Sequence, residues 1–130
     1  PKPVLVQEDI ENVVSYLRGL EKQPMRSFRR VDRSPKMVAM GRRIFADNCA
    51  RCHGTRGEGK HGTGEGAYAP SLNNPEFLKA ADDSFLMATI ALGRPGTPMP
   101  PFGLGFQGHR PFSADQIHAV IAFLRTWEKR

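Results

Sequence analysis

The chain has 130 residues, enough for one ordinary domain or slightly more. Its 13 glycines and 11 prolines favour helices joined by long, turn-rich loops over a compact helical bundle. A net charge of +6 is typical of proteins that bind nucleic acids, anionic membranes or acidic proteins. We find no nucleic-acid motif, and the two tyrosines and one tryptophan do not alternate with basic residues as a stacking platform would, so acidic protein surfaces are the expected partners.

No stretch is long and apolar enough to span a membrane, and no signal peptide is present. The sequence begins at Pro1 rather than at a methionine. We therefore expect a processed chain or a piece of a longer one.

The first predicted element is an amphipathic helix from residue 7 to residue 20. Its acidic residues fall in the first turn, where the helix dipole favours negative charge. Its apolar side chains fall at helical spacing and form one stripe. That stripe consists of Ile10, Val13, Val14, Leu17 and Leu20.

The last predicted helix, residues 113–127, repeats this stripe. A shift of 107 residues places Ile10 on Ile117, Val13 on Val120, Leu17 on Leu124, Arg18 on Arg125, Glu21 on Glu128 and Lys22 on Lys129. Two amphipathic helices can resemble each other by chance. The alternative is that residues 1–21 are the last helix of an upstream copy of the same domain.

Residues 22–34 form a predicted basic linker in which only Asp32 is acidic. Such a run is ordinarily just solvated. The alternative is an extended basic strap lying on an acidic partner, a neighbouring subunit or an anionic lipid surface.

A second helix is predicted to start after Ser34, which can cap it, with Pro35 in the first position. Gly41 and Phe45 lie on its inner face. Because Gly41 has no side chain, another helix can approach closely there; the alternative is a glycine that is merely tolerated, at a cost of about 1 kcal/mol relative to alanine.

This helix leads into Cys49-Ala50-Arg51-Cys52-His53, the attachment signature of a c-type haem. Each thiol adds to one porphyrin vinyl group, and the adjacent histidine is then held beneath the iron. A redox dithiol would need a βαβ context, and a zinc site would need a second pair of ligands at metal spacing. We find no βαβ pattern. We also find no second pair of metal ligands, because there are no other cysteines and the remaining histidines, His61, His109 and His118, are scattered. The sequence therefore predicts one haem c, covalently attached through Cys49 and Cys52.

A glycine-rich segment, residues 54–66, follows the motif. It lacks the flanking strand and the Gly-Lys-Ser/Thr ending of a phosphate loop. We interpret it as a flexible loop that can approach a flat ligand closely, with His61 exposed to solvent.

Two short helices come next, at residues 75–79 with Asn74 as cap and at residues 83–92 with Asp82 or Asp83 as cap. Three prolines then surround Met99, which lies 46 positions after His53, enough chain to reach the far side of a haem. A second glycine-rich loop, residues 103–111, precedes the last helix, where Ser113 and Gln116 form a capping box.

In this order the motifs resemble a bacterial class I cytochrome c domain, over residues 35–130. The matching segments are Gly41-Arg42-Arg43-Ile44-Phe45, Cys49 to Gly54, Ala69-Pro70-Ser71-Leu72, Gly96-Thr97-Pro98-Met99-Pro100 and Leu124-Arg125-Thr126-Trp127. The resemblance implies an all-α fold, with helices and Gly/Pro-rich loops wrapped around one haem. It implies His53 and Met99 as the axial metal ligands.

The same resemblance implies that the Pro70 carbonyl accepts a hydrogen bond from the His53 ring. It makes Tyr68 and Arg94 candidates for hydrogen bonds to the haem propionates. It also implies that Gly41 and Phe45 cross the final helix near Leu124 and Trp127. The additional N-terminal helix and the long loop 103–111 depart from the simple family pattern and point to a domain anchored in a larger assembly.

We expect one-electron transfer rather than enzymatic catalysis, since ligation by histidine and methionine closes the iron and raises its potential. The favoured role is a haem subunit or domain of a respiratory or photosynthetic complex, peripheral on the periplasmic or outer face of the cytoplasmic membrane. One alternative is a freely diffusing periplasmic carrier. Another is a haem enzyme with an open distal site, served by His61 or His109, and a minor one is bis-histidine ligation through His109.

Overall fold

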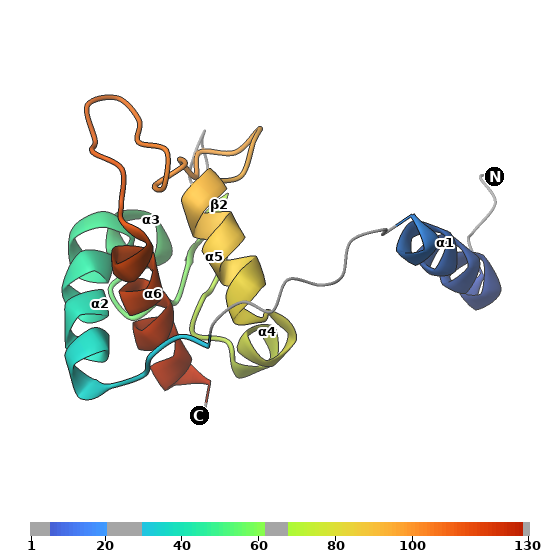
Figure 1. Ribbon diagram of the computed structural model, residues 1–130, viewed down its shortest axis with the longest axis horizontal. Coiled ribbons are helices and arrows are strands. Elements are labelled where there is room, and N and C mark those ends of the chain that lie inside the picture. Colours follow the sequence, from blue (N-terminus) through green and yellow to red (C-terminus); the bar gives the residue numbers. More distant parts are fainter. Residues whose placement is uncertain (1–5, 21–29, 62–67, 129–130) are drawn as a thin grey trace.

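The computed structural model describes residues 6–20, 30–61 and 68–128, and its regular secondary structure is almost entirely helical (Figure 1). Every helix predicted from the sequence is present, with ends within two residues of expectation, except that the last one, predicted over residues 113–127, is α-helical only to Leu124 and continues as a 3-10 turn to Trp127. Residues 22–29, most of the predicted basic linker 22–34, lie outside the described residues. The elements are α1 (Gln7–Gly19), α2 (Pro35–Asn48), α3 (Ala50–His53), β1 (Lys60–His61), β2 (Tyr68–Ala69), α4 (Pro75–Ala80), α5 (Asp83–Leu92), α6 (Ala114–Leu124) and the 3-10 turn η1 (Arg125–Trp127).

The caps predicted from the sequence are in place. The Ser34 hydroxyl accepts from the N–H of Met37 at the start of α2, and the Asp82 carboxylate, rather than that of Asp83, accepts from Phe85 N–H at the start of α5. The reciprocal pair of Ser113 and Gln116 opens α6. These contacts satisfy amide groups that the first turn of a helix otherwise leaves unpaired.

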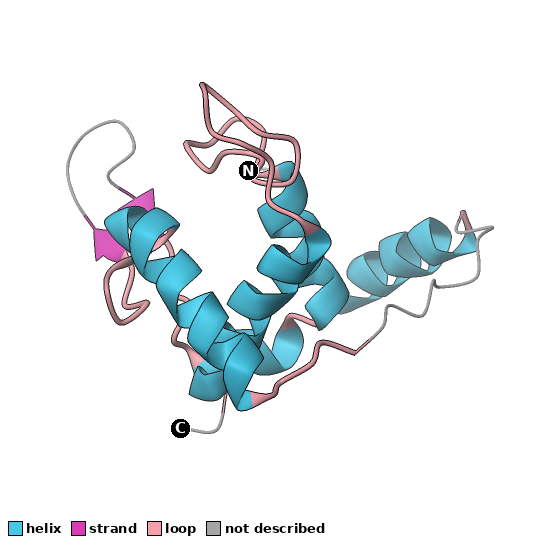
Figure 2. Cartoon of the chain, turned by 60° about the vertical axis from the view of Figure 1, so that its left-hand side comes forward, coloured by secondary structure: helices cyan, strands magenta, loops and turns pink. Residues whose placement is uncertain are grey.

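Helices α2 and α6 pack side by side and form the centre of the fold (Figures 1 and 2). A Cβ atom on Gly41 would lie 1.8 Å from the carbonyl oxygen of Ala119 and 3.0 Å from Cβ of Phe123, so only glycine allows this approach. The ring of Phe45 packs at 5.4 Å from that of Phe123 and at 5.5 Å from that of Trp127.

The expected crossing of Gly41 near Leu124 needs correction, because Gly41 meets α6 at Ala119 and Phe123. Gly41 lies one turn before Phe45, so it contacts an earlier turn of α6 than Phe45 does. The expected contact of Phe45 with Trp127 is present.

The hydrophobic core surrounds α6, which is buried on nearly all sides. A helix that is apolar all round is stable only when other elements cover it. Here α2 and α5 do so, while α4 packs on η1. Its buried side chains are Ile117, Ala119, Val120, Ile121, Ala122, Phe123 and Leu124.

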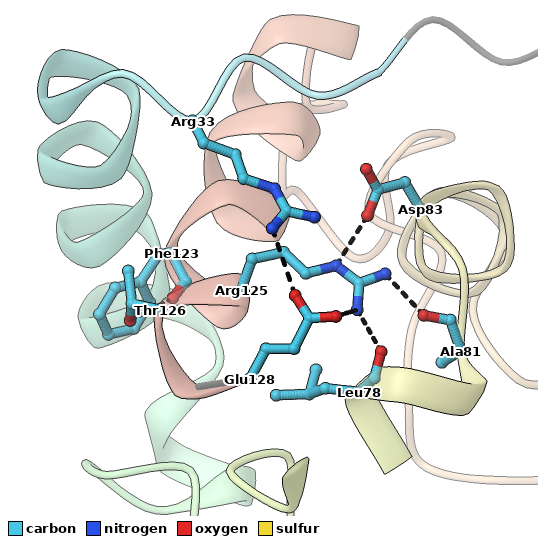
Figure 3. Close-up of polar contacts among 8 residues, drawn as sticks. All are labelled: Arg33, Leu78, Ala81, Asp83, Phe123, Arg125, Thr126 and Glu128. Atoms are coloured by element: carbon cyan, nitrogen blue, oxygen red, sulfur yellow. Dashed lines mark hydrogen bonds and ion pairs between the residues drawn. The ribbon is translucent and has the colours of Figure 1, made fainter. Parts of the chain in front are cut away.

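The end of α6 is tied to the α4–α5 corner by Arg125, a buried cation (Figure 3). Its guanidinium donates to the carbonyl oxygens of Leu78 and Ala81, at 2.6 Å in the second case, and to the Asp83 carboxylate at 2.8 Å. Glu128 lies on its other side at 3.7 Å. All these partners are acceptors, so the buried charge is well compensated.

The packed unit begins before α2. Val31 is buried in the core, and Arg33 forms an ion pair with Glu128 at 3.2 Å (Figure 3). Asp32 accepts hydrogen bonds from Ser34. The segment just before α2 therefore belongs to the folded domain.

Helix α1 stands differently, because all of its residues are exposed. Its apolar stripe is covered by none of the other described elements. Across the three described ranges, no helix combines the length and the apolar character that crossing a bilayer requires.

Candidate haem-binding site

The two cysteines and the histidine of the motif lie on one turn of helix. Helix α2 ends at Asn48, and Cys49 caps the four-residue α3 that follows. His53 N–H donates to the Cys49 carbonyl at 2.9 Å, and Cys52 N–H does so at 3.1 Å. This turn fixes the two thiols and the imidazole relative to one another.

The two thiols have different surroundings. Cys52 is exposed and Cys49 is half-buried. Burial, with a smaller contribution from Cys52, raises the pKa of the Cys49 thiol to about 12. The free thiol is therefore neutral at physiological pH.

The His53 ring is buried, and its Nδ1 lies 3.0 Å from the carbonyl oxygen of Pro70. A carbonyl only accepts, so Nδ1 carries the hydrogen, and in the neutral ring Nε2 keeps its lone pair. Nε2 has no hydrogen-bond partner among the described residues. A histidine with one nitrogen held by a carbonyl and the other free is suited to bind a metal ion.

Glycines hold the Pro70 carbonyl in place. Gly59, at φ +82°, donates from its N–H to the His53 carbonyl at 2.7 Å. A Cβ on Gly59 would lie 2.8 Å from the Ala69 carbonyl oxygen and 2.8 Å from the Ser71 nitrogen. The loop after the motif thus packs directly against the segment that orients His53.

The same loop differs from its prediction in one respect. It contains a short antiparallel pair in which Lys60 faces Ala69 and His61 faces Tyr68. The sequence predicted only a flexible loop, since two-residue strands have no detectable alternation pattern. The part of that loop after His61, including Gly62, Gly64 and Gly66, lies outside the described residues, as does the His61 side chain.

Met99 lies half-buried against the core in the loop between α5 and α6. Its carbonyl accepts from Arg94 N–H at 3.2 Å, and its N–H donates to the Thr97 hydroxyl at 3.3 Å. That hydroxyl donates in turn to the Arg94 carbonyl at 2.7 Å. These bonds, together with the prolines, fix the backbone from which the thioether projects.

The two candidate propionate residues are both exposed. Tyr68 lies in β2, and the Arg94 guanidinium lies over the Phe85 ring, 5.4 Å from its centre. Their role as propionate donors stays a prediction.

His109 is not an open ligand. Its Nδ1 lies 2.8 Å from the Arg110 carbonyl oxygen, and its Nε2 lies 3.0 Å from Oδ1 of Asn48. Both ring nitrogens face oxygen acceptors at hydrogen-bond distance, which weighs against ligation of iron by His109. His118, half-buried on α6, has no hydrogen bond from its ring to the described residues.

These residues fit a covalently bound haem. Two thiols precede an imidazole whose Nε2 is free, and apolar surface remains for a flat ligand to cover. Helix α5 is mostly apolar after its first turn, yet Phe85 and Leu92 are exposed and Met87 is only partly buried. A helix of this kind calls for a second apolar neighbour besides α6.

The sequence matches the cytochrome c family over residues 38–128, and the chain belongs to that family. It is 32% identical over 124 residues to the cbb3-type cytochrome c oxidase subunit CcoP of Rhodobacter capsulatus, an alignment that covers 95% of this chain and 37% of that protein. It is 36% identical over 93 residues to the cbb3-type cytochrome c oxidase subunit FixP of Bradyrhizobium diazoefficiens, covering 72% of this chain and 28% of that one. The chain thus spans about a third of the length of these curated relatives.

Among solved structures, cytochrome cL from Methylophaga aminisulfidivorans shares the fold, with a TM-score of 0.58 at 23% identity over 95% of this chain and 72% of that one. The predicted all-α class I cytochrome c fold is confirmed.

The sequence did not reveal the role of Gly59, because a glycine-rich stretch does not indicate which glycine packs against another segment.

Proposed function

We propose that the chain transfers one electron at a time through a single haem c, which Cys49 and Cys52 would bind covalently and whose iron His53 and Met99 would ligate. The observation that carries the proposal is the His53 ring, held at Nδ1 by the Pro70 carbonyl and free at Nε2, on the same helical turn as two cysteines. Membership of the cytochrome c family supports it.

When bound, the haem supplies the iron that alternates between its reduced and oxidised states. The protein's share of the chemistry lies in its side chains. The Met99 thioether favours the reduced state, and ligation by methionine and histidine raises the potential. The hydrogen bond to Pro70 keeps the His53 ring oriented and increases its basicity as a ligand.

Replacing the proposed distal ligand tests this assignment. We expect the haem-loaded Met99→Ala protein to lose the methionine-to-iron charge-transfer band and to bind cyanide rapidly when oxidised. Met40→Ala, in α2 on a surface that Lys36 and Gln116 also line, is the matched control and should keep the wild-type spectrum. A wild-type protein that lacks the band and binds cyanide rapidly would instead favour the haem-enzyme alternative.

We also propose that the domain serves as a fixed haem subunit of a respiratory oxidase complex on the periplasmic face. The names of the relatives CcoP and FixP support this role over that of a diffusing carrier. The test is copurification of the full-length chain with oxidase subunits after detergent extraction at high salt. A full-length protein that stays in the soluble fraction as a monomer would contradict it.

A third proposal concerns α1, which we infer is the last helix of a second cytochrome c domain that lies upstream. In α6, Ile117, Val120 and Leu124 are 2%, 1% and 3% exposed. Their equivalents in α1 under the 107-residue shift, Ile10, Val13 and Leu17, are 46%, 52% and 58% exposed. Helix α1 therefore carries the core pattern of a terminal helix without the elements that bury it.

Counting haem per polypeptide decides the matter. The full-length gene product should hold two haems, while a protein limited to residues 30–130 should hold one. One haem in the full-length protein would contradict the upstream domain.

A further inference from the structure

The loop that carries the proposed methionine ligand, residues 93–112 and here called the methionine loop, is fastened to α5 on one side. Phe102 N–H donates to the Ile90 carbonyl at 3.1 Å, and Gly103 N–H donates to the Ala91 carbonyl at 2.9 Å. These bonds continue from the end of the helix, so this part of the loop is held in place by α5.

On its other side the methionine loop reaches the haem-attachment turn through His109. Nε2 of His109 lies 3.0 Å from Oδ1 of Asn48, the last residue of α2 and the neighbour of Cys49. Within the described part of the chain, this is the only hydrogen bond between the methionine loop and α2 or α3. Figure 1 shows the loop, in orange, passing beyond the α3 end of α2.

The position of the His109 ring is set by an aromatic cluster. The ring stacks on Phe106 at 4.9 Å with an angle of 4° between the planes. It meets Phe102 edge to face at 5.6 Å and Phe112 at 5.2 Å. Its backbone pairs with that of Phe106 across a tight turn. The imidazole is thus held by packing, and aromatic contacts of this kind contribute to its orientation.

The polarity of the contact follows from Asn48. Its Nδ2 donates to the Ile44 carbonyl at 2.9 Å, which leaves Oδ1 as the acceptor facing His109. A ring with hydrogen on Nε2 therefore donates to Asn48. The doubly protonated ring donates both to Asn48 and to the Arg110 carbonyl 2.8 Å from Nδ1.

We propose that His109 is a positioning residue for Met99: through its hydrogen bond to Asn48 it holds the methionine loop against the haem-attachment turn. The inference rests on the proposed ligation by His53 and Met99. A loop that is hydrogen-bonded both to α5 and to the end of α2 would keep the Met99 thioether at the haem iron and would prevent competing ligands from binding there. Without the contact, no hydrogen bond within the described residues ties the loop to α2 or α3.

Two variants remove this hydrogen bond, one by changing His109 and the other by changing Asn48. His109→Phe keeps an aromatic ring in the cluster but has no ring nitrogen, and Asn48→Leu keeps a similar volume but removes the acceptor. The readouts are the rate of cyanide binding to the oxidised, haem-loaded protein and the intensity of the methionine-to-iron band. Since cyanide must wait for methionine to dissociate, we expect each variant to bind it about fivefold faster, the change that the loss of one typical hydrogen bond gives.

The double variant and a control make the test specific. His109→Phe with Asn48→Leu should bind cyanide no faster than the faster single variant, because both changes break one contact. His118→Gln changes a histidine on α6 whose ring forms no hydrogen bond with the described part of the methionine loop, and it should leave the rate and the band at wild-type values.

Wild-type cyanide rates in both single variants would overturn the proposal, as would fully additive effects in the double variant. If one variant fails to load haem, the other still decides. The proposed function fails separately, when Met99→Ala keeps the charge-transfer band. Loss of the band in Met99→Ala with unchanged rates in the His109 and Asn48 variants refutes the positioning role alone.

Discussion

His53 takes its orientation from a carbonyl 17 residues further along the chain. The sequence, read with the family resemblance, predicted this partner, Pro70, but not how it is held. Gly59 holds it, with a backbone conformation and a clearance that only glycine provides. At this scale the ligand types follow from the motif, while their geometry depends on close backbone contacts.

The Glu58 carboxylate beside this loop predicts an acid-dependent change in stability. Its pKa is lowered from the ordinary value of 4.5, mainly by hydrogen bonds from its own backbone N–H and that of Arg56, the latter at 2.8 Å. The folded state thus binds the proton less tightly than the unfolded state. This contribution to stability is present above pH 4.5 and is lost as the pH falls through the folded-state pKa.

We therefore expect the melting temperature of Glu58→Gln to fall less than that of the wild type on acidification, in thermal unfolding of the haem-loaded protein. The difference should be small, because the carboxylate is exposed and well solvated. A difference in melting temperature between the two proteins that stays the same at every pH would contradict the role of Glu58.

Two contacts between elements contribute most to holding the fold together. One is the packing of α2 on α6, and the other is the attachment of η1 to the α4–α5 corner. Amphipathic spacing and caps predicted where the helices lie. The pattern did not predict that α6 is covered on both sides, nor that Arg125 is buried, since an arginine near a chain end is ordinarily exposed.

Gly41→Ala tests the helix crossing. A Cβ atom 1.8 Å from the Ala119 carbonyl oxygen forces two packed helices apart. We expect a loss of about 3 kcal/mol in the free energy of unfolding, at the upper end of the usual cost of overpacking, measured by denaturant titration of the haem-loaded protein. Gly19→Ala, in α1 with nothing within 4 Å, is the control and should leave the stability of the domain unchanged.

Arg125→Met tests the tie between η1 and the α4–α5 corner. The change leaves the Leu78 and Ala81 carbonyls without their donor and Asp83 without its counter-ion. Removing one partner of such a buried ion pair costs about 3 kcal/mol, and chemical unfolding should reveal a loss of this size.

Arg33→Ala is the matched control for Arg125. It breaks the ion pair between Arg33 and Glu128, whose side chains are 46% and 27% exposed, respectively. Because surface ion pairs contribute little, we expect a cost of at most about 1 kcal/mol. Equal losses in the two variants would mean that burial does not determine the importance of Arg125.

For the whole molecule, the net charge of +6 governs long-range encounters. We propose that this charge steers the protein toward acidic surfaces. The rate of oxidation by ferricyanide, an anion, should therefore fall as salt is raised, since the screening length shrinks from about 30 Å at 0.01 M to about 3 Å at 1 M. A cationic cobalt complex is the control and should show the opposite trend; a ferricyanide rate independent of salt would rule out steering.

The sequence by itself predicted the chemistry of the proposed site and determined the positions of the helices. Two thiols before a histidine, a methionine among prolines and apolar spacing of 3.6 residues are local patterns, and each constrains its own segment. Only the tertiary structure decided which segments meet: Gly59 against Ala69, Gly41 against Ala119, Arg125 against the α4–α5 corner and His109 against Asn48. The physical reason is that such contacts join residues distant along the chain, and their partners are fixed by packing and by the pairing of buried polar groups rather than by local periodicity.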